Sequence, residues 1–412
     1  MQTYIHNIGE LVTVNTNGTN IKVGKDMNEL GIIENAAILI EDGIIKWVGS
    51  EKEFNMDLSH EIHNIDATKY TVLPGFVDCH THLLYVNGRE NEFSMRAAGK
   101  SYQEIAEMGG GILSTVQDTK ISDKRMLKKP TNKRLDEILS MGTTTVEIKS
   151  GYGLNSKNEI KMLEAINELF DENPIDIIPT FLGAHAFPKD ISHEKYIDEI
   201  CNNMIPYIAK KRLAKFCDVF CEKGYFSIDE TRLILETGKK HGLIPKLHAE
   251  ELTHTAAVEL GVELEAISVD HLEHISKEGI DALSKSKTVA VLLPGVSFYL
   301  GHKPAPARDI IDAGAIAAIS SDYNPGSCAS GNMQLMMTIA ITQMKMSIEE
   351  AICASTINGA VALGVQNIVG SIEVGKKADL VIYKTRNHKQ ITYHFGTNHV
   401  YMVMKNGNLL QF

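Results

Sequence analysis

The two ends of this chain carry the alternating apolar and polar pattern of short antiparallel strands. Near the N-terminus, Ala36–Ile40 and Ile44–Val48 flank Asp42-Gly43, a dipeptide typical of a tight β-hairpin. The C-terminal segments of the same kind are Asp379–Tyr383, Tyr401–Met404 and Leu409–Phe412. Two β-rich ends around a different middle predict one small sheet domain assembled from both termini, residues 1–72 and 361–412.

Between these ends, apolar strand-like runs alternate with helical patterns. The candidate strands are Val72–Asp78, Thr143–Ile148, Asp176–Leu182, Phe216–Phe220, Ile244–Leu247, Ala266–Val269, Val289–Leu293 and Ile316–Ser320. Helices are predicted at Lys157–Phe170 and at Asp229–His241, the latter opening on a capping-box spacing. Eight strands in βα order favour a (β/α)8 TIM barrel of the α/β class over residues 73–360. A doubly wound sheet is the alternative.

Four of the predicted strands end on side chains that can bind a metal ion. His80 and His82 follow the first strand, and alternation along a strand points both to one face. His248 and Asp322 end later strands, where a barrel would bring them round to the same point. A doubly wound sheet would not usually gather ligands in this way. The pattern therefore predicts a metal site of His80, His82, His248 and Asp322 at the C-terminal mouth of the barrel.

The residue types limit the kind of ion and the number of ions. Three imidazoles and one carboxylate suit Zn²⁺ or iron and poorly suit Mg²⁺ or Ca²⁺. Two-metal hydrolases of this architecture hold the second ion with a modified lysine that ends strand four, and Phe216–Glu222 offers no lysine. We therefore expect one ion. Satisfied core histidines with a capping aspartate are the alternative, but they would leave several polar groups converging in an apolar barrel without a shared partner.

Composition argues against some classes of partner but not against a metal site. The 412 residues are 43% hydrophobic and 23% charged, with a net charge of −11, which disfavours nucleic acid and anionic membranes as partners. No apolar run is long enough to span a bilayer. The six cysteines are sparse for this length and are interpreted as reduced core thiols of a cytoplasmic protein. A homodimer is expected.

Further polar residues surround the predicted mouth. His271 ends strand six and could polarise a carbonyl or relay a proton, although a structural hydrogen bond is the alternative. One of the adjacent Glu250 and Glu251 can face the pocket. Arg89 lies on the loop after the first ligands, where its fork-shaped cation suits a small-molecule carboxylate substrate. Gly109-Gly110-Gly111 could form an anion-binding nest, but a tight turn is the safer interpretation.

The metal ligand Asp322 can orient a metal-bound water and accept its proton, because the cation lowers the water pKa toward ~7. The sequence leaves the general base open among Asp322, His271 and Glu251. These residues alone predict metal-assisted hydrolysis of a cyclic amide or amidine with an anionic tail.

Several motifs resemble the amidohydrolase superfamily and, within it, the imidazolonepropionase family. The superfamily pattern is carried by Leu73–His82 and by Gly370–Leu380. The narrower resemblance rests on Gly109–Thr115, Glu147–Leu154, Phe181–His185 and Ser321–Ser327. The motifs follow the family order over nearly the whole chain, and no ligand position is substituted.

The resemblance implies a barrel with a composite β-sandwich and one Zn²⁺ or Fe³⁺ per subunit. It implies hydrolysis of the ring amide of 4-imidazolone-5-propanoate to N-formimidoyl-L-glutamate, in histidine degradation, with His271 as the proposed catalytic histidine. The family's substrate contacts map onto Arg89, Tyr152, His185, Glu251, Asn324, Gly326 and Ser327. The alternatives are another mononuclear amidohydrolase, such as a heterocycle deaminase, and a non-catalytic scaffold, which typically lacks some of the four ligands.

Overall fold

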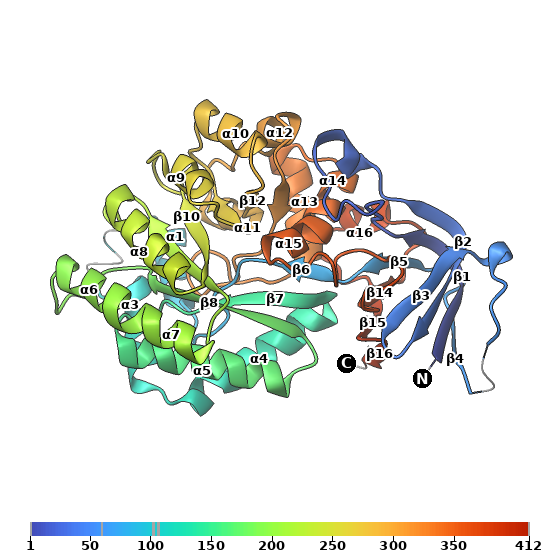
Figure 1. The fold of residues 1–412 in the computed structure, drawn as a ribbon, viewed down its shortest axis with the longest axis horizontal. Coiled ribbons are helices and arrows are strands. Elements are labelled where there is room, and N and C mark those ends of the chain that lie inside the picture. The colour runs from blue at the N-terminus through green and yellow to red at the C-terminus, as the bar shows by residue number, and fades with distance from the viewer. Residues whose placement is uncertain (1, 59–60, 101–103, 105–107, 411–412) are drawn as a thin grey trace.

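The computed structural model describes residues 2–58, 61–100, 104 and 108–410. One of its two eight-stranded sheets is parallel throughout, with its strands in the order of the sequence, the arrangement of a barrel (Figure 1). These strands are β6 (Phe76–Asp78), β7 (Thr143–Lys149), β8 (Asp176–Ala184), β9 (Phe216–Cys221), β10 (Ile244–Ala249), β11 (Ser268–His271), β12 (Val289–Leu292) and β13 (Ala317–Ile319). The predicted α/β barrel is therefore confirmed.

Helices follow the barrel strands and cover the sheet from outside (Figure 1). They are α1 (Glu90–Ala97), α3 (Ile112–Ile121), α4 (Lys124–Ser140), α5 (Ser156–Glu172), α6 (His193–Glu199), the π-helical η3 (Ile200–Met204), α7 (Ile205–Lys211), α8 (Ile228–Lys240), α9 (Ala257–Glu263), α10 (Lys277–Ser284), α11 (Pro294–Leu300), α12 (Ala307–Asp312), α13 (Met333–Met344), α14 (Ile348–Ser355), α15 (Ile357–Ala362) and α16 (Lys389–Tyr393). The two predicted helices correspond to α5 and α8, and α8 begins with the expected capping box at Ser227.

The two chain ends build a separate β domain at one side of the barrel, where Figure 1 places both termini. Its strands are β1 (Gln2–Val12), β2 (Ile32–Glu41), β3 (Ile44–Ser50), β4 (His63–Asp66), β5 (Thr71–Pro74), β14 (Leu380–Tyr383), β15 (Val400–Lys405) and β16 (Asn408–Leu410), with short 3-10 turns η1 (Gly24–Asn28) and η2 (Glu51–Glu53). Most neighbours pair antiparallel, and β1 also pairs parallel with β4 and β5. This arrangement confirms the predicted β domain from both termini, whose last two residues, 411–412, lie outside the described residues.

The first predicted barrel strand, Val72–Asp78, is two strands that belong to different sheets. β5 pairs with β14 in the β domain, whereas β6 pairs with β7 in the barrel. The break is at Gly75, where an added Cβ would lie 2.2 Å from Oγ1 of Thr144. The backbone passes too close to the neighbouring strand for a side chain there. The predicted boundary between residues 72 and 73 falls inside β5, and the domain boundaries stay a prediction.

The barrel closes through the residues that follow its first and last strands. Over the described residues, β6 and β13 share no ladder, but Thr81 and Tyr323 form a parallel bridge. Two backbone hydrogen bonds flank this bridge: the Asp322 amide donates to the His80 carbonyl and the His82 amide to the Tyr323 carbonyl, each at 3.0 Å. The closing seam therefore carries three of the four predicted metal ligands.

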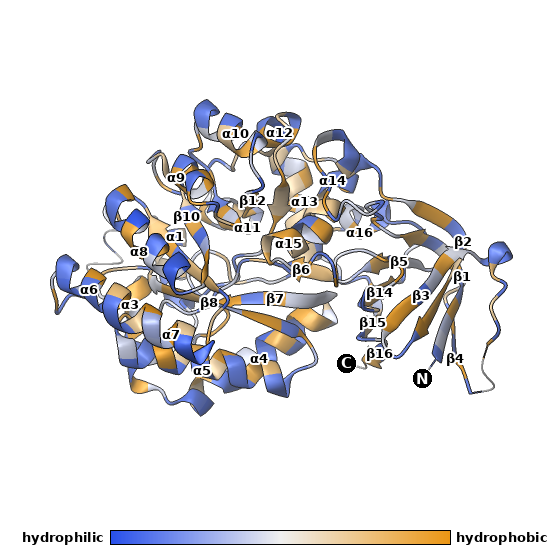
Figure 2. Cartoon of the chain, in the orientation of Figure 1, coloured by the Kyte–Doolittle hydropathy of each residue, from blue (hydrophilic) through white to orange (hydrophobic). Residues whose placement is uncertain are grey.

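The buried core is mostly apolar and polar residues lie on the outer faces of the helices, but barrel strands such as β7 also carry buried polar residues (Figure 2). All six cysteines are buried and unpaired, as predicted from their small number and their position in apolar stretches. No helix among the described residues has the length and apolar content needed to cross a membrane.

Candidate functional site

A cavity of about 420 Å³ opens at the C-terminal ends of the barrel strands. This is the end where barrel enzymes place their active sites. The predicted residues that line it are His82, Arg89, Tyr152, His185, His248, Glu251, His271, Asp322, Asn324, Gly326 and Ser327.

Four buried donor atoms converge at the bottom of this cavity. Asp322 Oδ1 lies 3.5 Å from His80 Nε2 and 3.4 Å from His82 Nε2. His248 Nε2 lies 3.4 Å from His82 Nε2. All four side chains are at most 4% exposed. The structure therefore brings together the residues predicted to hold a metal ion.

The state of these atoms fits a cation. His80 Nε2 and Asp322 Oδ1 are buried without a hydrogen-bond partner, which is costly unless an ion satisfies them. Burial lowers the pKa of His80 and His82 well below the ordinary value, so both rings are neutral and present a lone pair. Burial, with the charge of Glu251, raises the pKa of Asp322 well above its usual range, which a neighbouring cation would oppose.

Carboxylates orient two of these histidines from behind. His80 Nδ1 lies 2.6 Å from Asp270 Oδ2, and His248 Nδ1 lies 3.1 Å from Asp218 Oδ1. Each ring donates its Nδ1–H to the carboxylate, which leaves Nε2 free to bind the metal. Asp218 and Asp270 are fully buried.

Two buried lysines balance these carboxylates. Lys149 Nζ lies 2.7 Å from Asp218 Oδ2 and 2.8 Å from Glu147 Oε2. Lys246 Nζ lies 3.0 Å from Glu147 Oε1 and donates to the carbonyl of Cys79, next to His80. Burial alone would raise the pKa of Asp218, but the charges of His248 and Lys149 hold it well below its usual value. We refer to Glu147, Lys149, Asp218, Lys246 and Asp270 as the charged layer, for which the sequence alone predicted no role.

We expect Lys149→Met to weaken metal binding by about 10- to 100-fold, because Asp218 loses the ammonium that fixes it behind His248. Competition with a chromophoric chelator measures this affinity in protein whose fold is checked by circular dichroism. Lys376→Met is the matched control, since Lys376 is a buried lysine of the β domain that pairs with Glu373. Wild-type metal affinity in Lys149→Met would exclude this role.

The backbone is strained where the site strands end. Glu250, His271, Leu272 and Asp322 have φ values of 57°, 86°, 73° and 49°, a region that residues other than glycine rarely occupy. Such strain persists only where the surrounding structure imposes it, and it concentrates at functional sites.

His271 and Glu251 face each other at the edge of the cavity. His271 Nε2 lies 3.6 Å from Glu251 Oε2, and burial raises the pKa of Glu251 to about 7. On the other side, His271 Nδ1 lies 3.8 Å from Glu273 Oε2. Burial and the charge of Glu251 raise the pKa of Glu273 well above its ordinary value. A carboxyl group with a pKa near neutrality suits proton transfer at physiological pH.

Tyr152 and His185 form one wall of the cavity. Burial raises the pKa of Tyr152, so its phenol stays an O–H donor. Burial, with the charge of His248, lowers the pKa of His185 to about 3, and its Nδ1 lies 3.1 Å from the Gly151 carbonyl. Buried Glu159 holds the loop that carries Tyr152 by accepting hydrogen bonds from the amides of Gly151, Gly153 and Leu154.

The turn after Asp322 forms the opposite wall. Asn324 uses its amide within the turn: it donates to the Asp322 carbonyl and to Ser327 Oγ, and it accepts from the amides of Gly326 and Ser327. Arg89 lies over this turn and donates from Nε to Thr115 Oγ1 at 3.0 Å. An added Cβ at Gly326 would be 2.4 Å from Arg89 Nη1, so glycine makes room for the guanidinium.

The structure distinguishes two pairs of alternatives that the sequence leaves open. Of the adjacent carboxylates, Glu251 lines the cavity, whereas Glu250 lies 3.1 Å from His254 outside it. The Gly111 amide donates to Glu92 Oε1 at 2.9 Å, and Gly109 and Gly111 have positive φ values. The Gly111 amide is therefore already hydrogen-bonded to a carboxylate of the protein, which favours the tight turn over the anion-binding nest.

Some cavity residues were not predicted from the sequence. Glu92 and Arg96 lie on α1, and Tyr225, Leu300 and His302 lie in loops or at helix ends. Arg96 could have been found from its spacing, because it follows Arg89 by seven positions and two helical turns return to the same side.

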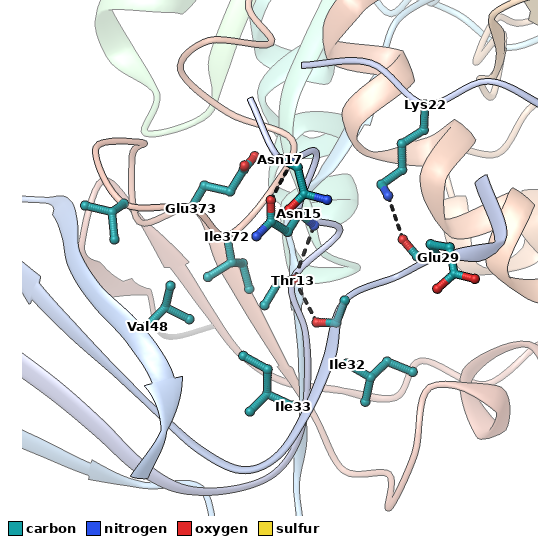
Figure 3. A pocket seen from close by; sticks show the side chains of 12 residues that line it. Thr13, Asn15, Asn17, Lys22, Glu29, Ile32, Ile33, Val48, Ile372 and Glu373 are labelled. Carbon is teal, nitrogen blue, oxygen red and sulfur yellow. Dashed lines mark hydrogen bonds between the residues drawn. The ribbon is translucent and has the colours of Figure 1, made fainter. Parts of the chain in front are cut away.

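A second cavity, of about 540 Å³, lies between the β domain and the loop after residue 371 (Figure 3). Lys22 Nζ there donates to the Glu29 carbonyl at 2.6 Å. Glu373 accepts from Thr16 and Ser371 and pairs with Lys376. Because Lys22 and Glu373 already have protein partners, this cavity does not have the character of a reactive site.

Known proteins are similar to this chain in sequence and in fold. The profile of the amidohydrolase family matches residues 71–410. Imidazolonepropionase from Geobacillus sp. (strain WCH70) is 44% identical over 99% of this chain and 97% of its own length. Imidazolonepropionase from Alkaliphilus oremlandii (strain OhILAs) is 46% identical with the same coverage. A zinc-bound adenosine deaminase from Xanthomonas campestris has a TM-score of 0.74 at 16% identity, covering 99% of this chain and 92% of that chain. At that identity the likeness concerns the fold alone.

Proposed function

The chain belongs to the amidohydrolase family and, within it, to the imidazolonepropionases, and on this basis we propose that its cavity is an imidazolonepropionase active site. The enzyme hydrolyses the ring amide C–N bond of 4-imidazolone-5-propanoate and yields N-formimidoyl-L-glutamate, a step of histidine degradation. The homodimer and the cytoplasmic location stay predictions.

One observation of the site supports this function most directly. Three imidazoles and a carboxylate converge on one point, beside a cavity that also contains Arg89. Such a donor set suits one Zn²⁺ or Fe³⁺, held by His80, His82, His248 and Asp322. When bound, the ion supplies an activated water and polarises the carbonyl that is attacked.

The remaining residues bind the substrate and move the proton. Arg89 pairs with the propionate carboxylate, and Tyr152 and His185 contact the ring. The carboxylate of Glu251 takes a proton from water as the C–O bond forms, and it returns that proton to the ring nitrogen as the C–N bond breaks. His271 lies within reach of the same carboxylate and orients it.

The decisive experiment follows the ultraviolet absorbance of freshly made imidazolonepropionate and identifies the product by mass spectrometry. We expect conversion to N-formimidoyl-L-glutamate, reversible loss of activity with a chelator, and one ion per chain by elemental analysis. Brisk ammonia release from purines instead would establish a heterocycle deaminase, and the absence of bound metal would indicate a scaffold.

A further inference from the structure

We propose that Arg96 is a second arginine that recognises the substrate carboxylate, beside Arg89, and that it sets the preference for an anionic tail. The inference rests on the proposed function and adds a specificity residue to the same cavity. Arg96 lies in the last turn of α1, and Arg89 is the residue that precedes the helix. Both line the cavity.

The two guanidinium groups meet at Gly326. Arg96 Nη2 donates to the Gly326 carbonyl at 2.9 Å. Arg89 Nη1 packs against the same residue, where a Cβ would come within 2.4 Å. Two cations from one helical segment are therefore held side by side against one backbone position of the cavity wall.

Neither cation has a carboxylate partner from the protein. Among the residues that the structure describes, no Asp or Glu oxygen lies within 4.0 Å of Arg89 or Arg96 nitrogens. Glu92, on the same helix, instead accepts from the Gly111 amide. Two unpaired guanidinium groups at the wall of a cavity create a positive potential that attracts an anion. Carboxylate is the group whose geometry matches the guanidinium fork.

Arg96 retains donors for a ligand. A guanidinium has five N–H groups; one donates to the Gly326 carbonyl and one interacts with the Tyr299 hydroxyl, so the others remain for a ligand. Its planar group also lies 5.1 Å from the ring centroid of Tyr299 on α11, and Phe93 packs on the same ring. These contacts hold the guanidinium in place. They also define the competing explanation, in which Arg96 only fastens α1 to α11.

Binding of an unreactive ligand pair separates charge recognition from fastening. Imidazole-4-propionate and its uncharged primary amide are titrated calorimetrically into metal-loaded wild type, Arg96→Met and Arg96→Lys. We expect Arg96→Met to weaken binding of the carboxylate by about 10- to 100-fold and to leave the amide within about twofold, with partial recovery in Arg96→Lys. Arg232→Met, which removes a half-buried arginine of α8 that pairs with Glu263 away from the cavity, is the control and should change neither.

Equal losses for the carboxylate and the amide in Arg96→Met would overturn the proposal, and so would unchanged binding of the carboxylate. If Arg96→Met or Arg96→Lys fails to fold, Arg96→Gln is tested in its place. Because these titrations need no turnover, they test Arg96 separately from the proposed reaction. Turnover of imidazolonepropionate by the wild type decides that reaction whatever the result for Arg96.

Discussion

Asp322→Asn is expected to lose at least about three orders of magnitude in kcat, because metal activation of water supplies several kcal/mol and each 1.36 kcal/mol corresponds to about tenfold. Asparagine is the sharpest replacement at this position. It keeps the shape of the side chain, and it tolerates the positive φ of 49° better than alanine would. Steady-state kinetics and the metal content per chain measure the effect.

The control for Asp322→Asn is Asp281→Asn, at an exposed position of α10 that pairs with Lys285. It should change neither turnover nor metal content. Full activity of Asp322→Asn with one ion bound would contradict the expected need for the Asp322 carboxylate in turnover.

Glu251→Gln is expected to lower kcat by about 10²- to 10⁴-fold, the usual cost of removing a general acid–base group. Wild-type kcat/KM should rise with pH through about 7, where Glu251 ionises, and the variant should lose this rise. Glu250→Gln is the matched control, because the neighbouring carboxylate faces His254 outside the cavity. If the variant keeps the wild-type kcat and the rise of kcat/KM with pH, the general base is His271 or Asp322 instead.

The same substitution should stabilise the metal-free protein at high pH. The pKa of Glu251 is raised by burial from an ordinary 4.5 to about 7, so its contribution to stability is fully present below pH 4.5 and is lost as pH rises through 7. Glutamine cannot ionise, and Glu251→Gln should therefore gain up to about 3 kcal/mol above pH 7 and nothing at pH 4. Thermal unfolding at the two pH values measures the difference. An equal change at both pH values would contradict a Glu251 carboxyl that ionises between them.

The residues that could be predicted from the sequence are those marked by a pattern in the neighbouring residues. His80, His82, His248 and Asp322 each follow an apolar run, and a barrel gathers strand ends at one mouth. The eight strands and the β domain were found for the same reason, since alternation and hairpin dipeptides are properties of short segments.

The parts that could not be predicted depend on contacts between distant segments. Lys149 and Lys246 lie within strands, where sequence gives no sign that both ammonium groups meet Glu147 inside the barrel. The passage of the chain from one sheet to the other at Gly75 could not be predicted either. The residue that excludes a side chain there, Thr144, is distant in sequence. The sequence shows Arg96 only as an arginine of a helix; its contact with the Gly326 carbonyl depends on how α1 packs against that turn.

The bridge between Thr81 and Tyr323 has a consequence beyond its geometry. His80 and His82 on one side of this bridge and Asp322 on the other would bind the same ion. The ion would then stabilise the closure of the barrel in addition to its role in catalysis. Loss of the ion should loosen the wall locally, and amide hydrogen exchange should quicken first in the stretches around residues 80 and 322. Catalytic competence and the integrity of the barrel wall are in this way tied to a single binding event.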